Sequence, residues 1–215
     1  MEERKTYYRR HLPHYQPEEA TFHLVFRLAG SLPIQVIEEL RIERQRFERQ
    51  TRSLKGKAEQ QKQRDQFRFV DFRRFDALLD GSKTGPKWLG ERTVASIVKE
   101  AIHHRDGRAF DLLAYCIMPN HVHMVAAVGR NVIPTYKHPP LYRALQSLKR
   151  YTARQCNLAL GRQGSFWQDE SYDHVVREDS ELERTISYVL ENPVNAGLVD
   201  SWEKWPWSYC KKEYL

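Results

Sequence analysis

The sequence predicts an α+β fold, an antiparallel sheet with helices packed on one face. Short apolar or alternating segments are interleaved with longer amphipathic ones, in the order strand, helix, strand, strand, helix, strand, helix. Two of the short segments, residues 110–117 and 121–128, are separated by a brief connection that contains the turn residues Pro119 and Asn120. So short a connection makes the two strands antiparallel, and this order of elements suits helices on one face of the sheet.

The N-terminal half begins with a strand and continues into a charged segment. Residues 21–28 alternate in polarity and predict the first strand. Residues 34–66 are rich in Arg, Glu, Gln and Lys, with sparse apolar residues, and predict a long charged helix or a pair of helices. Apolar spacing resumes over 67–79, and the Gly- and Pro-containing residues 80–86 predict a loop.

The C-terminal half supplies the other helices and the last strand. Amphipathic helices are expected over 91–104 and 141–160, with a loop over 129–140 before the second of them. Residues 171–177 predict the last strand, and residues 179–193 predict the last helix.

That last helix carries signals for both of its ends. Asp179 or Ser180 is suited to the N-cap, and Ser180 with Glu183 three residues later fits a capping box. Pro193 predicts the stop, because the residue before a proline disfavours the helical conformation.

A His-Val-His sequence opens the strand over 121–128. Side chains alternate faces along a strand, so His121 and His123 point the same way, roughly 7 Å apart at the backbone, while Val122 points opposite. Two imidazoles on one face can hold a divalent metal or clamp a phosphate. Alternatively, both are simply surface positions of a half-exposed strand.

Tyr188 and Asn192 are spaced four residues apart on the last helix, so they are neighbours on one stripe. Such a pair can supply a phenolic nucleophile and a neutral ligand for a metal or a phosphate. The alternative is that Tyr188 is a packing residue and Asn192 a C-cap.

Composition favours a polyanionic partner. The chain of 215 residues has a net charge of +7 and a pI near 9.3, although a merely basic protein would show the same values. We expect one domain over 1–215, with a charged helical insertion near the N-terminus at about 33–90. Within it, residues 41–74 carry 12 Lys and Arg against 5 Asp and Glu, which indicates a solvated helical face or a DNA-tracking arm.

Several classes of protein find no support in the sequence. No apolar run approaches the roughly 18 residues of a membrane span, and the N-terminus lacks the apolar core of a signal peptide. Cys116, Cys156 and Cys210 are widely spaced and odd in number, which fits reduced thiols in the cytosol. No P-loop, GxGxxG or GxSxG pattern is present, so we expect no nucleotide cofactor and no serine hydrolase.

Three motifs in their order along the chain, Met-Pro-Asn-His-Val-His, a Gly-led aromatic segment and a Tyr-x-x-x-Asn-Pro-Val helix, resemble the single-tyrosine HUH transposases, specifically the REP-associated tyrosine transposases. The resemblance covers most of the chain except residues 33–90. Its stretches are residues 10–15, 20–27, 118–125 and 161–176, the helix of Tyr188 with residues 192–199, and the Trp-rich residues 202–207.

The resemblance implies a ferredoxin-like antiparallel sheet and a metal-dependent single-stranded DNA endonuclease and strand transferase. It implies His121 and His123 as metal ligands, Asn192 as the third ligand and Tyr188 as the catalytic nucleophile that forms a covalent 5′-phosphotyrosine. The metal would be Mg²⁺ or Mn²⁺, since mixed nitrogen and oxygen ligands suit these ions.

The partner implied by the resemblance is single-stranded DNA beside a short hairpin, such as a repetitive extragenic palindrome (REP). A monomer or homodimer in the cytoplasm, associated with the nucleoid, would bind it. Candidate DNA-binding residues are Lys149, Arg150, Arg154, Arg162 and Trp167.

Three alternatives remain open. Tyr172 is a rival nucleophile, although it falls in a predicted strand without an amide four residues on. The chain could bind hairpin DNA or structured RNA without cleaving it. It could also be a metal-dependent phosphoesterase that uses the two histidines with water.

Overall fold

The computed structural model describes residues 7–9, 13–15, 19–128 and 140–215. Its contacts divide the chain into two compact units, residues 1–29 with 87–215 (unit 1) and residues 30–86 (unit 2). The loop expected over 129–140 lies almost entirely outside the described residues. None of the described helices is both long and apolar enough to span a membrane.

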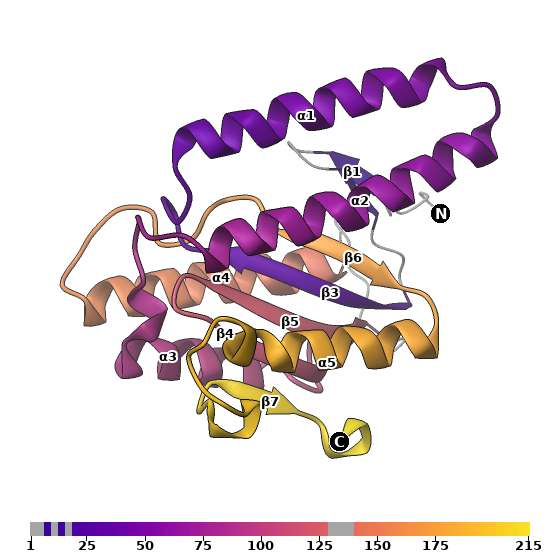
Figure 1. Ribbon diagram of the computed structural model, residues 1–215. Helices are drawn as coiled ribbons and strands as arrows, with labels where there is room; N and C mark the ends of the chain where they lie inside the picture. Colours follow the sequence, from indigo (N-terminus) through magenta and orange to yellow (C-terminus); the bar gives the residue numbers. More distant parts are fainter. Residues whose placement is uncertain (1–6, 10–12, 16–18, 129–139) are drawn as a thin grey trace, which may run out of the picture. The chain divides into compact units, whose positions relative to one another are not determined.

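Unit 1 is built on a five-stranded antiparallel sheet with the strand order β6-β3-β5-β4-β7 (Figure 1). A separate two-stranded sheet pairs β1 with β2. The strands are β1 (Tyr7–Arg9), β2 (Pro13–Tyr15), β3 (Ala20–Arg27), β4 (Asp111–Ile117), β5 (His121–Val128), β6 (Tyr172–Val176) and β7 (Ser208–Cys210).

Four of these strands and two helices form a ferredoxin-like unit. β3, α3 (Arg92–His103), β4, β5, α4 (Pro140–Ala159) and β6 follow one another in the β-α-β-β-α-β order of that arrangement. The first strand lies between the third and the fourth, and β7 extends the edge beyond the second. The predicted α+β fold class is therefore confirmed, and the predicted strands and helices of this unit lie within two residues of their expected bounds.

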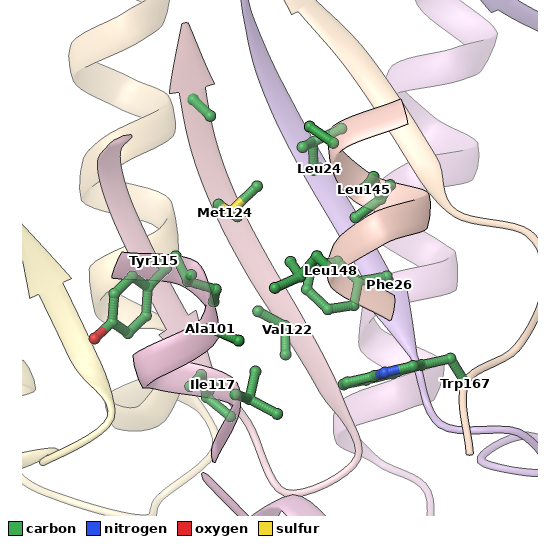
Figure 2. Close-up of a cluster of buried hydrophobic side chains, with 14 of the residues drawn as sticks. Leu24, Phe26, Ala101, Tyr115, Ile117, Val122, Met124, Leu145, Leu148 and Trp167 are labelled. Atoms are coloured by element: carbon green, nitrogen blue, oxygen red, sulfur yellow. The ribbon is translucent and has the colours of Figure 1, made fainter. Parts of the chain in front are cut away.

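The face of the sheet that α3 and α4 cover is apolar. Leu24 and Phe26 of β3 lie opposite Met124 and Val122 of β5, and all four side chains are buried. Figure 2 shows these side chains meeting Leu148 of α4. Burying such residues is worth about 1.5–3 kcal/mol each, so this layer is the main source of stability in unit 1.

The opposite face is also covered, by α5 (Asp179–Asn195). Its Ile186 and Val189 pack against Cys116 of β4 and Val125 of β5 in a second apolar cluster. Helices therefore lie on both faces of the sheet, where we expected one. The reason is visible in the strands: β4 and β5 are buried along nearly their whole length, as near-continuous apolar strands are when both faces are covered.

The start of α5 differs from the predicted capping box. The N-cap position is Glu178, and no side chain caps the helix there. Instead, the carboxylate of Glu181 accepts a hydrogen bond from the backbone N–H of Arg177 at 2.8 Å. The acidic side chain that accepts a backbone hydrogen bond at the start of α5 is thus Glu181 and not Glu183.

The end of α5 also differs from the prediction, because Pro193 lies inside the helix. A proline removes one backbone donor, and in the last turn the loss is small. The stop comes from Gly197, whose φ of 68° is the left-handed conformation that glycine adopts most readily. Hydrogen bonds from Gly197 N–H to Val194 O and from Leu198 N–H to Pro193 O complete a Schellman motif.

Unit 2 is a pair of helices, α1 (Ile34–Ser53) and α2 (Lys57–Asp80). Of the two predictions for this segment, one long helix or a pair of helices, the pair is observed. The apolar segment over 67–79 is part of α2. The rings of Phe47 and Phe67 stack between the helices at 3.9 Å. Ion pairs join the helices at three points, Arg44 to Asp71, Arg74 to Glu43 and Arg64 to Glu48.

The two ends of unit 2 meet at a narrow neck. The hydroxyl of Ser82 donates a hydrogen bond to the carbonyl of Ser31 at 3.0 Å. Gly85 has a φ of 85°, and a Cβ atom there would lie 2.4 Å from the carbonyl oxygen of Gly30. Only glycine allows the chain to leave unit 2 so close to the point where it entered.

Replacing Leu148 by Ala should lower the free energy of unfolding of unit 1 by about 2–5 kcal/mol, because the side chain is fully buried and leaves a cavity. Leu158, on the same helix, is 68% exposed, and its replacement by Ala should change stability by less than about 0.5 kcal/mol. Urea unfolding followed by tryptophan fluorescence reports on unit 1 alone, since all five Trp lie in residues 87–215. Equal losses in the two variants would contradict this core.

Candidate functional site

The two histidines of β5 lie side by side on the face of the sheet that α5 covers. The Nε2 atoms of His121 and His123 are 2.9 Å apart, and their rings meet edge to face at 4.7 Å. Both side chains are buried, so the alternative that they are surface positions is wrong. Two buried ring nitrogens so close are stable only with a proton or a cation between them.

The other nitrogen of each ring has its own partner. His121 Nδ1–H donates to the amide oxygen of Asn120 at 2.7 Å, which leaves the Nε2 lone pair available. His123 Nδ1 lies 3.2 Å from His23 Nε2. Histidines that bind metals characteristically donate their second N–H to such a partner. This donor set fits a divalent cation bound by the two Nε2 atoms.

His23 is a site residue that sequence analysis missed. It lies on β3, is 4% exposed, and its ring stacks on that of His123 with centroids 5.4 Å apart. The signal was a polar residue within an apolar strand, at the same alternation as Val25 and Arg27. That signal is weak, because nothing in a single sequence says which strand will pair with β5.

Tyr188 of α5 lies against this histidine cluster. Its ring meets that of His123 edge-on at 6.0 Å and that of His23 at 6.2 Å. The neighbouring residues Ile186 and Val189 hold α5 on the sheet and so place the tyrosine. The structure thus brings Tyr188 together with the two predicted metal ligands.

Asn192 is buried one turn beyond Tyr188 on α5. Its side-chain Nδ2 donates to the backbone carbonyl of Tyr188 at 2.8 Å, which fixes the amide plane. The amide oxygen is the atom that could bind a cation. Its assignment as third ligand stays a prediction.

The rival tyrosine, Tyr172, lies on the same face of the sheet but farther across it. Tyr172 of β6 pairs with Val25 of β3, which in turn pairs with His123 of β5. Two strand spacings separate Tyr172 from His123, roughly 9–10 Å at the backbone. Ring contact with His123 favours Tyr188 over Tyr172.

A hydrogen bond between His174 and Glu181 anchors the start of α5. His174 Nε2 lies 2.8 Å from the carboxylate of Glu181. Partial burial raises the pKa of Glu181, but the hydrogen bonds from His174 and from the Arg177 backbone outweigh it, and the pKa lies below its usual value. The carboxylate therefore stays charged at neutral pH and holds the helix against β6.

Of the expected DNA-binding residues, Lys149 is engaged within the protein. Its ammonium group donates to the carbonyls of Gln168 and Asp169 and to the hydroxyl of Ser171, at 2.7, 2.8 and 3.2 Å. These bonds hold the segment before β6 against α4. A phosphate contact by Lys149 stays a prediction.

Trp167 and Arg162 are also occupied. The Trp167 residue is 7% exposed and packs edge-on against Phe26 (Figure 2), so it belongs to the core, and a DNA contact by Trp167 stays a prediction. The Arg162 guanidinium lies over the Trp88 ring at 3.9 Å. Arg150 and Arg154 are exposed on α4, as a phosphate contact would require.

Comparison with known proteins gives matches in sequence and in fold. No family model matches the chain. A Haemophilus influenzae protein provisionally named a REP-associated tyrosine transposase is 29% identical over 104 residues, which cover 46% of this chain and 58% of that protein. The match therefore spans little more than half of the relative's length.

Among solved structures, a REP-associated tyrosine transposase bound to a REP hairpin superposes with a TM-score of 0.50 at 17% identity, covering 97% of this chain and 82% of the other. A Deinococcus radiodurans protein described provisionally as a transposase gives a TM-score of only 0.33 at 12% identity, over 81% and 91% of the two chains. The first of these shares the fold. The chain is thus similar in sequence to the Haemophilus influenzae protein over part of its length, and it shares the fold of the hairpin-bound transposase.

Proposed function

We propose that the chain is a metal-dependent single-stranded DNA endonuclease and strand transferase that acts beside hairpin DNA through a covalent phosphotyrosine at Tyr188. The observation that carries the proposal is the contact of the Tyr188 ring with His123, whose Nε2 is 2.9 Å from that of His121. This contact would place a nucleophile beside a cation site on the face of the sheet that α5 covers. The named relative and the hairpin-bound structure support the choice of DNA.

His121, His123 and Asn192 would hold a divalent ion, Mg²⁺ or Mn²⁺. When bound, such an ion polarises a phosphate oxygen and neutralises charge that builds in the transition state. His23 and Asn120 would orient the two imidazoles, each through the second ring nitrogen of its neighbour.

Tyr188 would perform the covalent step. Its phenolic oxygen bonds to the phosphorus while the bond from phosphorus to the 3′ oxygen breaks. The phenol gives up its proton and the leaving 3′ oxygen takes one, so the products are a 5′-phosphotyrosine and a free 3′-OH. Attack by a 3′-OH reverses these steps and joins strands without an external energy source.

Replacing Tyr188 by Phe should abolish the covalent adduct, because only the hydroxyl is removed and the ring contacts with the histidines remain. A labelled hairpin oligonucleotide incubated with Mn²⁺ should give a denaturation-resistant band with the wild type. Tyr172→Phe is the matched control and should keep the band. The assignment is wrong if the adduct survives in Tyr188→Phe and disappears in Tyr172→Phe.

Replacing His121 or His123 by Ala should lower cleavage at least about 100-fold and leave hairpin affinity within a few-fold, because these groups act mainly on the transition state. Cleavage rates and affinities on the same hairpin separate the two effects. Equal losses of both would mean that the histidines hold DNA directly. A wild type that binds hairpins tightly and never cleaves them would favour the non-catalytic binder.

The tip of the helical pair is the part of unit 2 best suited to a phosphate backbone. Three arginines pair with acids across the helices, from Arg64 and Glu48 toward the base. At the tip, Glu59 is the single acidic residue among 49–64, and its carboxylate already accepts a hydrogen bond from Gln63. The exposed cations there are Arg49, Arg52, Lys55, Lys57 and Lys62.

Replacing Lys55 and Lys57 together by Gln should weaken hairpin binding and flatten the slope of log affinity against log salt by up to about 1.4, since each neutralised single-strand phosphate contributes about 0.7. Affinity measured at several salt concentrations gives the slope. Lys204→Gln with Lys212→Gln removes the same charge from unit 1 and is the control. An unchanged slope in the Lys55 and Lys57 variant would make the tip a solvated surface only.

A further inference from the structure

Three histidines lie together on the face of the sheet under α5, and the third does not fit as a metal ligand. His23 Nε2 is 3.2 Å from Nδ1 of His123, whereas the nitrogen of His123 that faces His121 is Nε2. His23 therefore lies on the far side of the His123 ring from the candidate cation position. Its contribution must pass through His123.

The contact between His23 and His123 gives Nδ1 of His123 a partner that can accept its hydrogen. A neutral imidazole has one donor and one acceptor nitrogen. If Nδ1–H of His123 donates to Nε2 of His23, the Nε2 atom of His123 keeps its lone pair toward His121. Asn120 holds His121 in the same tautomer from the other side.

His23 also contacts the tyrosine of the site. Its ring meets that of Tyr188 edge-on, with an interplanar angle of 73°, and stacks on that of His123 at 25°. The side chain is 4% exposed and belongs to β3, which is paired with strands on both sides. A buried group on a rigid strand is well placed to limit the motion of both neighbours.

We infer that His23 is a positioning residue: it holds His123 in the Nδ1–H tautomer and fixes the ring surface against which Tyr188 packs. This inference rests on the proposed function. In this role His23 neither binds the metal directly nor serves only to pack the core.

Two kinds of substitution separate the acceptor from the ring. His23→Gln keeps an acceptor, because the amide oxygen lies near the position of Nε2. His23→Phe keeps a flat ring and removes the acceptor, and His23→Leu is the second variant without an acceptor should the Phe variant fail to fold. Tryptophan fluorescence under urea checks the fold of each.

The tautomer is read first, without metal, by two-bond ¹H–¹⁵N correlation of the imidazoles. With the proton between the two Nε2 atoms on His121, the wild type and His23→Gln should show His123 as the Nδ1–H form alone, and His23→Phe should show a mixture of forms. A single Nδ1–H form in all three proteins would overturn the inference, whatever the catalytic activity.

Calorimetric titration with Mn²⁺ then measures the consequence for binding. His23→Phe should bind Mn²⁺ about 10–100-fold more weakly than the wild type, and His23→Gln should stay within about threefold. Equal losses of Mn²⁺ affinity in both variants, or no loss in His23→Phe, would contradict the inference. His121→Ala tests the metal site itself and is measured in the same way. A wild type that binds no Mn²⁺ would defeat the proposed function, and the tautomer measurement would then decide the inference alone.

Discussion

The pairing of β5 with β3 on one side and β4 on the other is the constraint on which the site depends. Side chains alternate along β5, so one register sends Val122 and Met124 into the core under α3 and α4 and sends His121 and His123 toward α5. A slip of one residue would reverse this and bury imidazoles among leucines. The alternation of apolar side chains that stabilises the sheet therefore also directs the two histidines toward α5.

Burying polar rings on the second face brings a cost that the surrounding residues must offset. An unsatisfied buried polar group costs about 1–3 kcal/mol, and this face holds three imidazoles in contact. Asn120 and His23 supply partners from the turn and from β3, and α5 covers the cluster with apolar residues. Stability and chemistry are linked here, since the helix that excludes water also carries Tyr188.

The sequence predicted the elements whose signal is periodic and local. The shared face of His121 and His123 follows from strand geometry alone, and the stripe of Tyr188 and Asn192 follows from helix geometry. Pro193 was predicted to end α5, but the free-energy cost of a proline depends on its position in the helix and is small in the last turn. At the other end, Glu181 and not Glu183 accepts the backbone hydrogen bond, because Arg177 and His174 both contact its carboxylate.

What the sequence could not supply was pairing between distant segments. His23 and His123 are neighbours only because β3 lies beside β5, and the order of strands in a sheet cannot be predicted from the sequence of one strand. Lys149 and Trp167 were predicted to bind DNA from their residue types, and the sequence did not show that Lys149 bonds to backbone carbonyls and that Trp167 packs in the core. Residue type states what a side chain can do, whereas burial decides what it does.

The neck of unit 2 makes the helical pair a segment of adjustable length. Because Ser31 and Ser82 meet and Gly85 passes close to Gly30, the chain leaves unit 2 beside the point where it entered, whatever the length of the two helices between. Adding seven residues to each helix would carry the basic tip about 10 Å farther out. Insertions of equal length in the two helices would therefore change how far the basic tip extends, with no substitution around the histidines.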